Sequence, residues 1–85
     1  MTHTTIQLES NSGIITIFYH QEKAGFIEFT IKDNTLDIFH TEVDSAFGEK
    51  GLGKELVQAC VDYAKENNLK ITATCPYANA VLQKL

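Results

Sequence analysis

The sequence predicts an α+β domain in which an antiparallel β-meander is followed by a helix, a strand and a second helix. Two observations carry this prediction. The N-terminal half alternates apolar and polar residues between short polar turns, a pattern typical of paired strands. From residue 51 onward the apolar residues recur every three or four positions, as in an amphipathic helix. The 85 residues suffice for one modest core, so residues 1–85 are expected to form a single domain.

The N-terminal half is interpreted as strands joined by tight turns. Four strands are predicted, over residues 5–9, 14–20, 26–31 and 36–43. They are separated by polar segments that contain glycine or asparagine and reverse the chain, namely residues 11–13, 21–25 and 33–34. Because consecutive strands follow one another so closely, we expect them to pair as an antiparallel meander.

The second half predicts a helix, a strand and another helix. Apolar residues recur at helical spacing after Gly51, at Leu52, Leu56, Ala59, Cys60, Tyr63 and Ala64. Asn67 and Asn68 are expected to end this helix, since asparagine tolerates left-handed backbone angles. Residues 69–75 alternate again and predict a strand parallel to the one before the helix. Pro76 then suits the first turn of the last helix, where its missing N–H costs nothing.

The composition limits the classes of partner. The net charge is −4 and no run of basic residues occurs, so a nucleic-acid partner is not expected. The first ten residues do not resemble a signal peptide, and no apolar run is long enough to span a membrane. The two cysteines, Cys60 and Cys75, lack metal-ligand spacing, so no metal is expected. We therefore expect a soluble cytoplasmic protein with reduced thiols, either a monomer or a weak dimer.

The glycine-rich segment from Gly48 to Lys54 is the most informative part of the chain. It joins a strand to a helix, where free N–H groups and the helix dipole favour a phosphate or pyrophosphate. It is not a P-loop, because Glu55 stands where a magnesium-binding Ser or Thr is required. It also lacks the third glycine of a dinucleotide-binding fingerprint, since Leu56 occupies that position. On the local pattern alone, a turn that caps a helix without binding any ligand remains open.

The stretch from Phe39 to Tyr77 resembles the core of the GNAT superfamily of N-acetyltransferases, and most closely its minimal single-domain YjdJ-like members. The resembling segments are Phe39-His40-Thr41-Glu42-Val43, Lys50-Gly51-Leu52-Gly53-Lys54-Glu55-Leu56-Val57, Tyr63-Ala64 and Thr74-Cys75-Pro76-Tyr77. The resemblance covers nearly half of the chain and implies a GNAT-like fold. It also implies acetyl-CoA as the co-substrate.

The resemblance assigns a cofactor site residue by residue. The glycine motif of the family, Gln/Arg-x-x-Gly-x-Gly/Ala, places its two small residues on Gly51 and Gly53, but its first position falls on Gly48. The side chain of that first position is therefore missing, while the backbone cradle is retained. The strand before the loop would hold the pantetheine arm through its main chain. The implied cofactor-binding residues are Thr41, Val43, Glu49, Lys50, Gly51, Leu52, Gly53 and Lys54.

Cys75 is the first candidate for chemistry. If Pro76 is the first helical residue, the Cys75 thiol lies at the N-cap, where the helix dipole favours the thiolate. In the family that the chain resembles, this Cys-Pro pair lies beside the acetyl donor. Cys75 is either a nucleophile that accepts the acyl group or a small residue that only lines the pocket or packs in the core.

His40 and Glu42 are the other catalytic candidates. A histidine can act as a general base near neutral pH. Strict alternation places His40 on the strand face of Leu36 and Ile38, with Glu42 two residues farther on the same face. The pair forms either a proton relay or a polar end of the strand.

The predicted function is transfer of an acetyl group from acetyl-CoA to an amine of a small molecule, peptide or protein. Alignment of the two reactants alone can account for several kcal/mol of barrier lowering, so a small domain needs few dedicated side chains. Two alternatives remain at this point: a module that binds acyl-CoA without catalysis, and a protein-interaction domain that keeps the fold but not the cofactor. The identity of the acceptor amine is not predicted.

Overall fold

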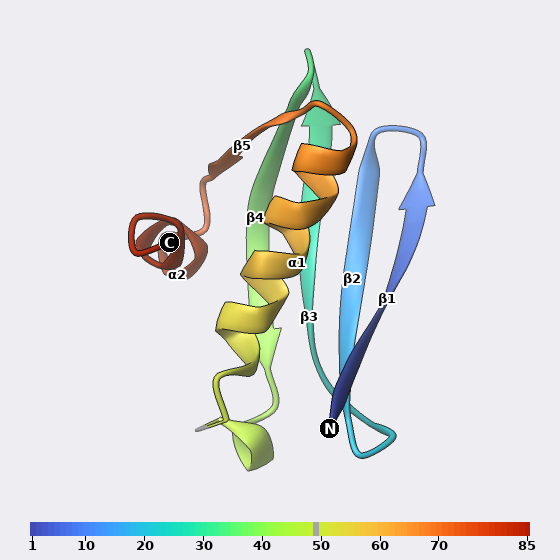
Figure 1. The fold of residues 1–85 in the computed structure, drawn as a ribbon, viewed down its shortest axis with the longest axis vertical. Coiled ribbons are helices and arrows are strands. Elements are labelled where there is room, and N and C mark those ends of the chain that lie inside the picture. The colour runs from blue at the N-terminus through green and yellow to red at the C-terminus, as the bar shows by residue number, and fades with distance from the viewer. Residues whose placement is uncertain (49) are drawn as a thin grey trace.

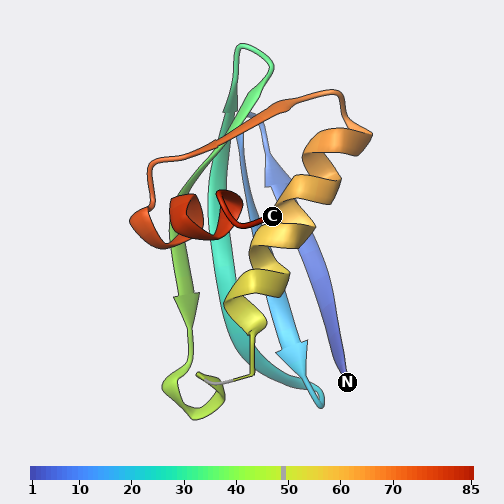
Figure 2. The same ribbon diagram turned by 60° about the vertical axis from the view of Figure 1, so that its left-hand side comes forward.

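The chain folds into two layers, a twisted five-stranded sheet and two helices that pack on one of its faces (Figure 1). The coordinates are a computed structural model that describes residues 1–48 and 50–85. Turning the molecule shows that α1 and α2 lie side by side on the same side of the sheet (Figure 2). The opposite face carries no helix in the described part of the chain, and we call it the open face.

The five strands lie in the sheet in the order in which they occur in the chain. Their bounds are β1 Thr2–Glu9, β2 Ser12–Tyr19, β3 Glu22–Lys32, β4 Thr35–Val43 and β5 Lys70–Ala73. The first four pair antiparallel and β5 pairs parallel to β4, which confirms the predicted meander and the predicted parallel last strand. Parallel pairing requires a crossover connection, and α1 supplies it.

The turn between β2 and β3 is tighter than the sequence suggested. We expected residues 21–25 to reverse the chain, but this was wrong: His20 and Gln21 form the turn, with φ angles of 50° and 72°. Gly25 instead lies inside β3, where a Cβ would be 2.6 Å from the carbonyl oxygen of Glu42. The glycine at this position therefore permits close approach of β4 rather than a turn.

Both helices begin where the sequence indicated, and α1 also ends there, whereas α2 ends at Leu82 and does not continue to Leu85 as expected. Helix α1 spans Leu52–Glu66 with Gly51 as its N-cap, and Asn68 adopts the left-handed conformation just beyond its end (φ 56°). Helix α2 spans Pro76–Leu82, with Cys75 at the N-cap and the proline in the first turn. A short 3-10 turn at Ser45–Phe47 connects β4 to the glycine segment and is capped by the Asp44 carboxylate, which accepts from the Ala46 N–H at 2.9 Å.

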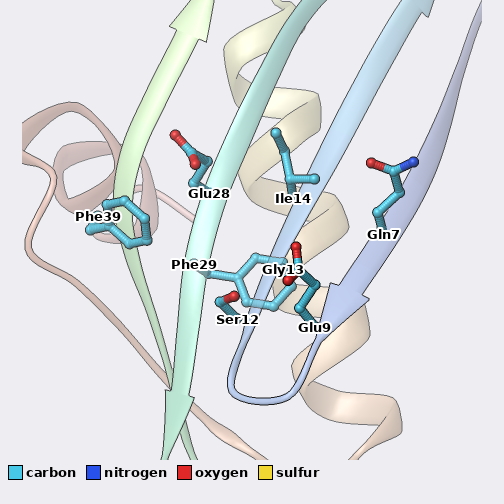
Figure 3. Close-up of a pocket in the computed structure, with 8 residues that line it drawn as sticks. All are labelled: Gln7, Glu9, Ser12, Gly13, Ile14, Glu28, Phe29 and Phe39. Carbon is cyan, nitrogen blue, oxygen red and sulfur yellow. The ribbon is translucent and has the colours of Figure 1, made fainter.

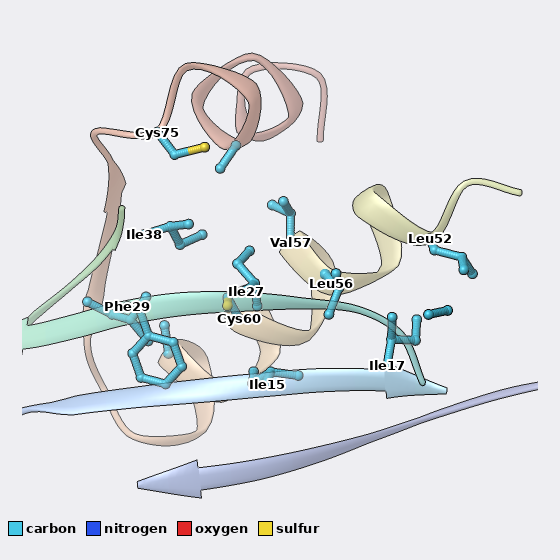
Figure 4. Close-up of a cluster of buried hydrophobic side chains, with 14 residues drawn as sticks. Ile15, Ile17, Ile27, Phe29, Ile38, Leu52, Leu56, Val57, Cys60 and Cys75 are labelled. Atoms are coloured by element: carbon cyan, nitrogen blue, oxygen red, sulfur yellow. The ribbon is translucent and has the colours of Figure 1, made fainter. Parts of the chain in front are cut away.

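The hydrophobic core lies between α1 and the covered face of the sheet (Figure 4). The sheet contributes Ile15, Ile17, Ala24, Ile27, Phe29, Leu36 and Ile38, and the helices contribute Leu52, Leu56, Val57, Cys60, Ala64 and Ala78, all of which are buried. Within the described residues the core contains no buried polar side chain. Burial of these apolar groups is the main force that holds the helices on the sheet.

A β-bulge divides β4 into two halves. Glu28 pairs with His40 and the next residue of β3, Phe29, pairs with Ile38, so that Phe39 is an extra residue without a partner. An extra residue reverses the alternation of side chains beyond it. Leu36 and Ile38 therefore face the core before the bulge, whereas the core-facing side chains after it are the odd-numbered ones, Thr41 and Val43.

A candidate cofactor cleft between β4 and β5

The strands β4 and β5 separate halfway along β4. They pair only from Thr35 to Ile38 on β4, and after that the carbonyl oxygen of Ile38 accepts hydrogen bonds from both the Thr74 and the Cys75 N–H groups, at 3.0 and 3.1 Å. The Asp37 carboxylate holds the paired part together, accepting from the Thr72 and Thr74 hydroxyls at 2.7 and 2.9 Å. Beyond this point β5 turns into α2, and the edge of β4 is left free.

The free edge of β4 offers main-chain hydrogen-bonding groups. The Asp44 N–H donates to the carbonyl oxygen of Ala24 on β3 at 2.8 Å. Because alternate residues of a strand point to opposite edges, the N–H and C=O groups of Thr41 and Val43 point away from β3. Within the described residues no main-chain partner meets them there. A ligand with an extended amide chain could therefore add to β4 as a strand does.

The N-terminus of α1 lies at the end of this edge. Gly51 adopts a left-handed conformation (φ 72°) that directs the chain into the helix, which explains the need for glycine at this position. The first intrahelical bond runs from the Glu55 N–H to the Gly51 carbonyl oxygen. The first-turn amides, on Leu52, Gly53 and Lys54, therefore have no partner within the helix and can donate to an anion.

A cavity of about 400 Å³ connects the two features. Its walls are Thr41 and Val43 on β4, the glycine segment at the start of α1, and Tyr77 on α2. Tyr77 was not among the predicted site residues, yet its phenol lies directly over Gly53: a Cβ there would be 2.8 Å from the Tyr77 Cζ atom. Gly53 thus provides room for the ring of Tyr77. The sequence signal for this role was the position of Tyr77 in the first turn after Cys75-Pro76.

The Cys75 thiol lies just behind the cavity wall. Its sulfur is 3.6 Å from the Oγ1 atom of Thr41, and the residue is almost fully buried. Burial alone would raise the pKa of Cys75, but the Ala78 N–H, the Thr41 hydroxyl and the Tyr77 and Thr41 N–H groups outweigh it and lower the pKa below its ordinary value. The sulfur makes no close capping hydrogen bond to α2, so the helix amides act as nearby partial charges.

The basic residues of the segment lie near the cavity without forming ion pairs in the described part of the chain. The Lys50 ammonium lies over the Tyr19 ring, 4.9 Å from its centroid, and Lys54 is exposed in the first turn of α1. Glu49, which we expected at the cofactor site, lies outside the described residues. Gly48 lines the cavity, but its N–H already donates to the carbonyl oxygen of Ser45 at 3.2 Å.

The expected placement of His40 and Glu42 was wrong in one respect. Their side chains are close, with 3.3 Å between His40 Nε2 and Glu42 Oε1, but they do not share the face of Leu36 and Ile38. The bulge at Phe39 turns both of them onto the open face, opposite to the side chains that line the cavity. Both are exposed, and the His40 ring lies 5.7 Å from the ring of Phe26.

A second hollow, of about 300 Å³, lies on the open face (Figure 3). The Glu9, Glu28 and Phe39 side chains surround it, and α1 lies behind the sheet in this view. It has no contact with the glycine segment, so it is separate from the cleft. Among the described residues no cluster of side chains suited to holding a metal is found, and no helix is long and apolar enough to cross a membrane.

Comparisons with known proteins agree with this geometry. Residues 15–85 match the family model described as GCN5-related N-acetyl-transferase. The protein NATD1 of Xenopus tropicalis is 44% identical over 43 residues, which are 51% of this chain and 39% of that protein. The protein NATD1 of Danio rerio is 34% identical over 56 residues, or 66% of this chain and 51% of that protein. The match therefore spans about half or less of the length of these relatives.

Solved structures share the fold. The ribosomal-protein-alanine N-acetyltransferase of Brucella melitensis biovar Abortus 2308 superposes with a TM-score of 0.79 at 16% identity, covering 91% of this chain and 62% of that one. The PaiA N-acetyltransferase of Thermoplasma acidophilum, solved in complex with coenzyme A, gives a TM-score of 0.65 at 20% identity over 69% of this chain and 37% of that one. With a family match that covers most of its length, this chain belongs to the GCN5-related N-acetyltransferase family.

Proposed function

We propose that the protein transfers an acetyl group from acetyl-CoA to an amine, and that the cleft between β4 and β5 holds the donor. One observation carries the proposal: the free edge of β4 at Thr41 and Val43 leads directly from the unpaired amides at the start of α1 to the Cys75 thiol. Acetyl-CoA has the matching parts in the matching order: a pyrophosphate, an arm with two amides, and a thioester.

Each part of the donor has a defined partner in this arrangement. The pyrophosphate lies on the first-turn amides of α1, where the helix dipole stabilises negative charge. The pantetheine amides bond to the outward main-chain groups of Val43 and to the carbonyl oxygen of Thr41, since the Thr41 N–H faces the Cys75 sulfur. The thioester then reaches the bulge at Phe39, beside Cys75. A cavity of about 400 Å³ accommodates the arm, since ligand sites commonly measure about 300–1,000 Å³.

The reaction joins the amine nitrogen to the acetyl carbon, breaks the carbon–sulfur bond, and releases coenzyme A as a thiol while the amine loses a proton. In the direct route the nitrogen attacks the thioester, and Cys75 only lines the donor site. In the two-step route the Cys75 thiolate first attacks the thioester, takes the acetyl group and releases the coenzyme A thiolate. The amine nitrogen then attacks the acetylated Cys75 and displaces the Cys75 thiolate. The lowered pKa and the neighbouring Thr41 hydroxyl support the second route.

The His40–Glu42 pair is proposed as the base that removes the proton from the amine. The pair lies on the open face next to the bulge, and the strands are separated at that level. An amine that approaches from the open face would therefore meet the imidazole before the thioester. Glu42 orients the ring through its 3.3 Å contact with His40 Nε2.

A second candidate function, binding of acyl-CoA without catalysis, is favoured by the glycine at position 48. That residue supplies no side chain to the donor, and its own N–H is occupied by Ser45. For either function we place the protein in the cytoplasm, because Cys60 and Cys75 are free thiols.

A pair of variants at Val43 tests the donor site. Val43→Pro removes the outward N–H while leaving the bonds to β3 in place, whereas Val43→Ala keeps that N–H and shortens only the side chain. With release of the coenzyme A thiol as the readout over a panel of amines, we expect the proline variant to raise the KM for acetyl-CoA well above that of the alanine variant. Equal KM values for the two variants would contradict the donor site. If the wild-type protein binds acetyl-CoA but turns over none of the amines, the second candidate function is favoured.

A further inference from the structure

The outer edge of β1 is uncovered in the described part of the chain. β1 is the first strand of the sheet and eight residues long. The carbonyl oxygen of Met1 accepts a bond from the His20 N–H at 3.1 Å, so the main-chain groups of odd-numbered residues face β2. Those of Thr4, Ile6 and Leu8 consequently face outward.

Apart from the charged residue Glu9 at its end, this edge lacks the features that normally protect an edge strand. β1 contains no proline or lysine, and its register with β2 runs unbroken from Thr2 to Glu9 without a bulge. Its two large apolar side chains, Ile6 and Leu8, are 41% and 52% exposed. Long, regular edges with exposed apolar residues pair readily with another strand, and natural proteins usually block them unless they are used.

We propose that this edge pairs antiparallel with the same edge of a second copy, so that two five-stranded sheets join into one mixed sheet of ten strands. The two-fold axis passes beside Ile6, which lies opposite Ile6 of the partner subunit. Thr4 lies opposite the partner's Leu8, and His3 lies opposite the partner's Glu9. The outward groups of Thr4, Ile6 and Leu8 then form the new ladder, because only outward-facing residues can bond across it.

The side chains at the two ends of β1 select this register. His3 and Glu9 lie near opposite ends of β1. In an antiparallel pair centred on Ile6, His3 of each copy therefore lies opposite Glu9 of the other copy, once at each end of the interface. They meet as pairs without main-chain bonds, in which side chains approach most closely. A pair shifted so that Thr4 faces the partner's Ile6 places His3 opposite Gln7 and loses both contacts. On the helix side, Ile6 and Leu8 of both copies form one apolar strip.

The charges on α1 do not prevent this pairing. Asp62 and Glu66 line a hollow of about 250 Å³ between β1 and α1, together with Ile6 and Tyr63. Because α1 packs over β2 and β3, several strand spacings separate the two copies of the helix. The helix axes are therefore farther apart than the screening length of about 10 Å at 0.1 M salt, although Asp62 and Glu66 lie on the β1 side of α1. Because these carboxylates attract positive charge, a basic extended peptide is a rival occupant of the same edge, and the last experiment of this subsection distinguishes it from a second copy.

The pairing leaves the cofactor cleft free. β4, β5 and α2 lie at the other side of the sheet from β1, so the two clefts lie at the far ends of the joined sheet (Figure 1). The dimer and the donor site can therefore be tested independently, and coenzyme A binding is expected to be the same in monomeric and dimeric variants.

Sedimentation equilibrium over a wide dilution series tests the proposal. We expect wild type to dimerise and Ile6→Lys to raise the dimer Kd on the order of tenfold or more, since two lysines then face each other. Leu85→Lys is the matched control: Leu85 is similarly exposed, at 51%, but lies at the end of the chain away from β1, and its Kd should equal that of wild type. A wild type that stays monomeric throughout, or an equal effect of both substitutions, overturns the proposal.

A charge exchange tests the register itself. His3→Glu places two carboxylates opposite each other at each end of the interface and should weaken the dimer, whereas the double variant His3→Glu/Glu9→Lys places a lysine opposite each new glutamate and should restore it. The His3 ring also stacks on Phe18 within one chain, with 4.8 Å between centroids, and the double variant carries the same loss of stacking as His3→Glu. Failure of the double variant to recover overturns the register. A monomeric wild type whose β1 amides shift upon addition of an alternating Lys-Val peptide overturns the dimer in favour of a basic strand.

Discussion

Substitution of Gly53 by alanine probes how Tyr77 and the start of α1 share the cleft. A Cβ at this position would lie 2.8 and 2.9 Å from the Cζ and Cε2 atoms of Tyr77, whereas ordinary carbon–carbon contacts lie near about 3.5–4.0 Å. The ring must therefore move by more than half an ångström, roughly the difference between those distances. Tyr77 is 49% exposed, so it can swing outward or into the cavity without unfolding α2.

The energetic effect on folding is expected to be small. Overpacking costs about 1–3 kcal/mol, and alanine in a helix recovers up to about 1 kcal/mol relative to glycine. The free energy of unfolding should thus fall by at most about 3 kcal/mol, which a domain with about 5–15 kcal/mol of stability tolerates. Affinity for coenzyme A should fall by about tenfold, because the displaced ring and the new methyl group narrow the cavity.

A double-mutant cycle separates the effect of the ring from that of the methyl group. In a Tyr77→Ala background, Gly53→Ala meets no ring, so its cost to stability should disappear and its effect on affinity should shrink. Gly51→Ala is the control, since nothing lies within 4 Å of a Cβ there and only its left-handed φ of 72° makes it unfavourable. Urea unfolding and calorimetric titration supply the two readouts. Additive effects of Gly53→Ala and Tyr77→Ala would refute the reasoning.

Three further predictions concern the thiols and the core. The Cys75 thiol, whose pKa is lowered, should react with iodoacetamide at pH values below the ordinary thiol range, and Cys75→Ser should abolish this reaction in the folded protein. Burial raises the pKa of Cys60 from 9.0 to about 12, so the unfolded chain holds fewer protons between those values. Stability should therefore fall as pH rises through that window, by at most about 1.4 kcal/mol per unit, and Cys60→Ala should flatten this part of a urea-derived stability curve; an unchanged slope would contradict the assignment. Ile27→Ala, at a fully buried position, should cost about 2–5 kcal/mol in urea unfolding, and a loss below 1 kcal/mol would argue against the described core.

Periodicity was sufficient to predict most of the fold. The change from alternation to helical spacing located α1, and Asn68 and Pro76 marked the boundaries of the two helices through their backbone preferences. The cleft followed from a local rule, because glycines at the entry of a helix indicate a close backbone approach wherever they occur. The parallel placement of β5 also followed, since α1 is long enough to serve as the crossover.

The remaining features depend on contacts between distant segments. The bulge at Phe39 reverses the faces of His40 and Glu42, and nothing in the local alternation of β4 signals it. It arises from how β4 pairs with β3, a long-range fit that one sequence does not display. The role of Tyr77 likewise depends on the packing of α2 against α1, where Gly53 leaves room for the ring. Gly25 was assigned to a turn because close approach and chain reversal favour the same residue.

The central claim is that the free edge of β4 and the start of α1 together bind acetyl-CoA. The most direct test is a titration of labelled protein with coenzyme A and acetyl-CoA, followed through backbone amide shifts. The account predicts saturable shifts at Thr41, Val43 and the first turn of α1, with a further change at Cys75 that depends on the acetyl group. Shifts that do not saturate, or that gather on the open face around Glu28 and Phe39, would contradict it.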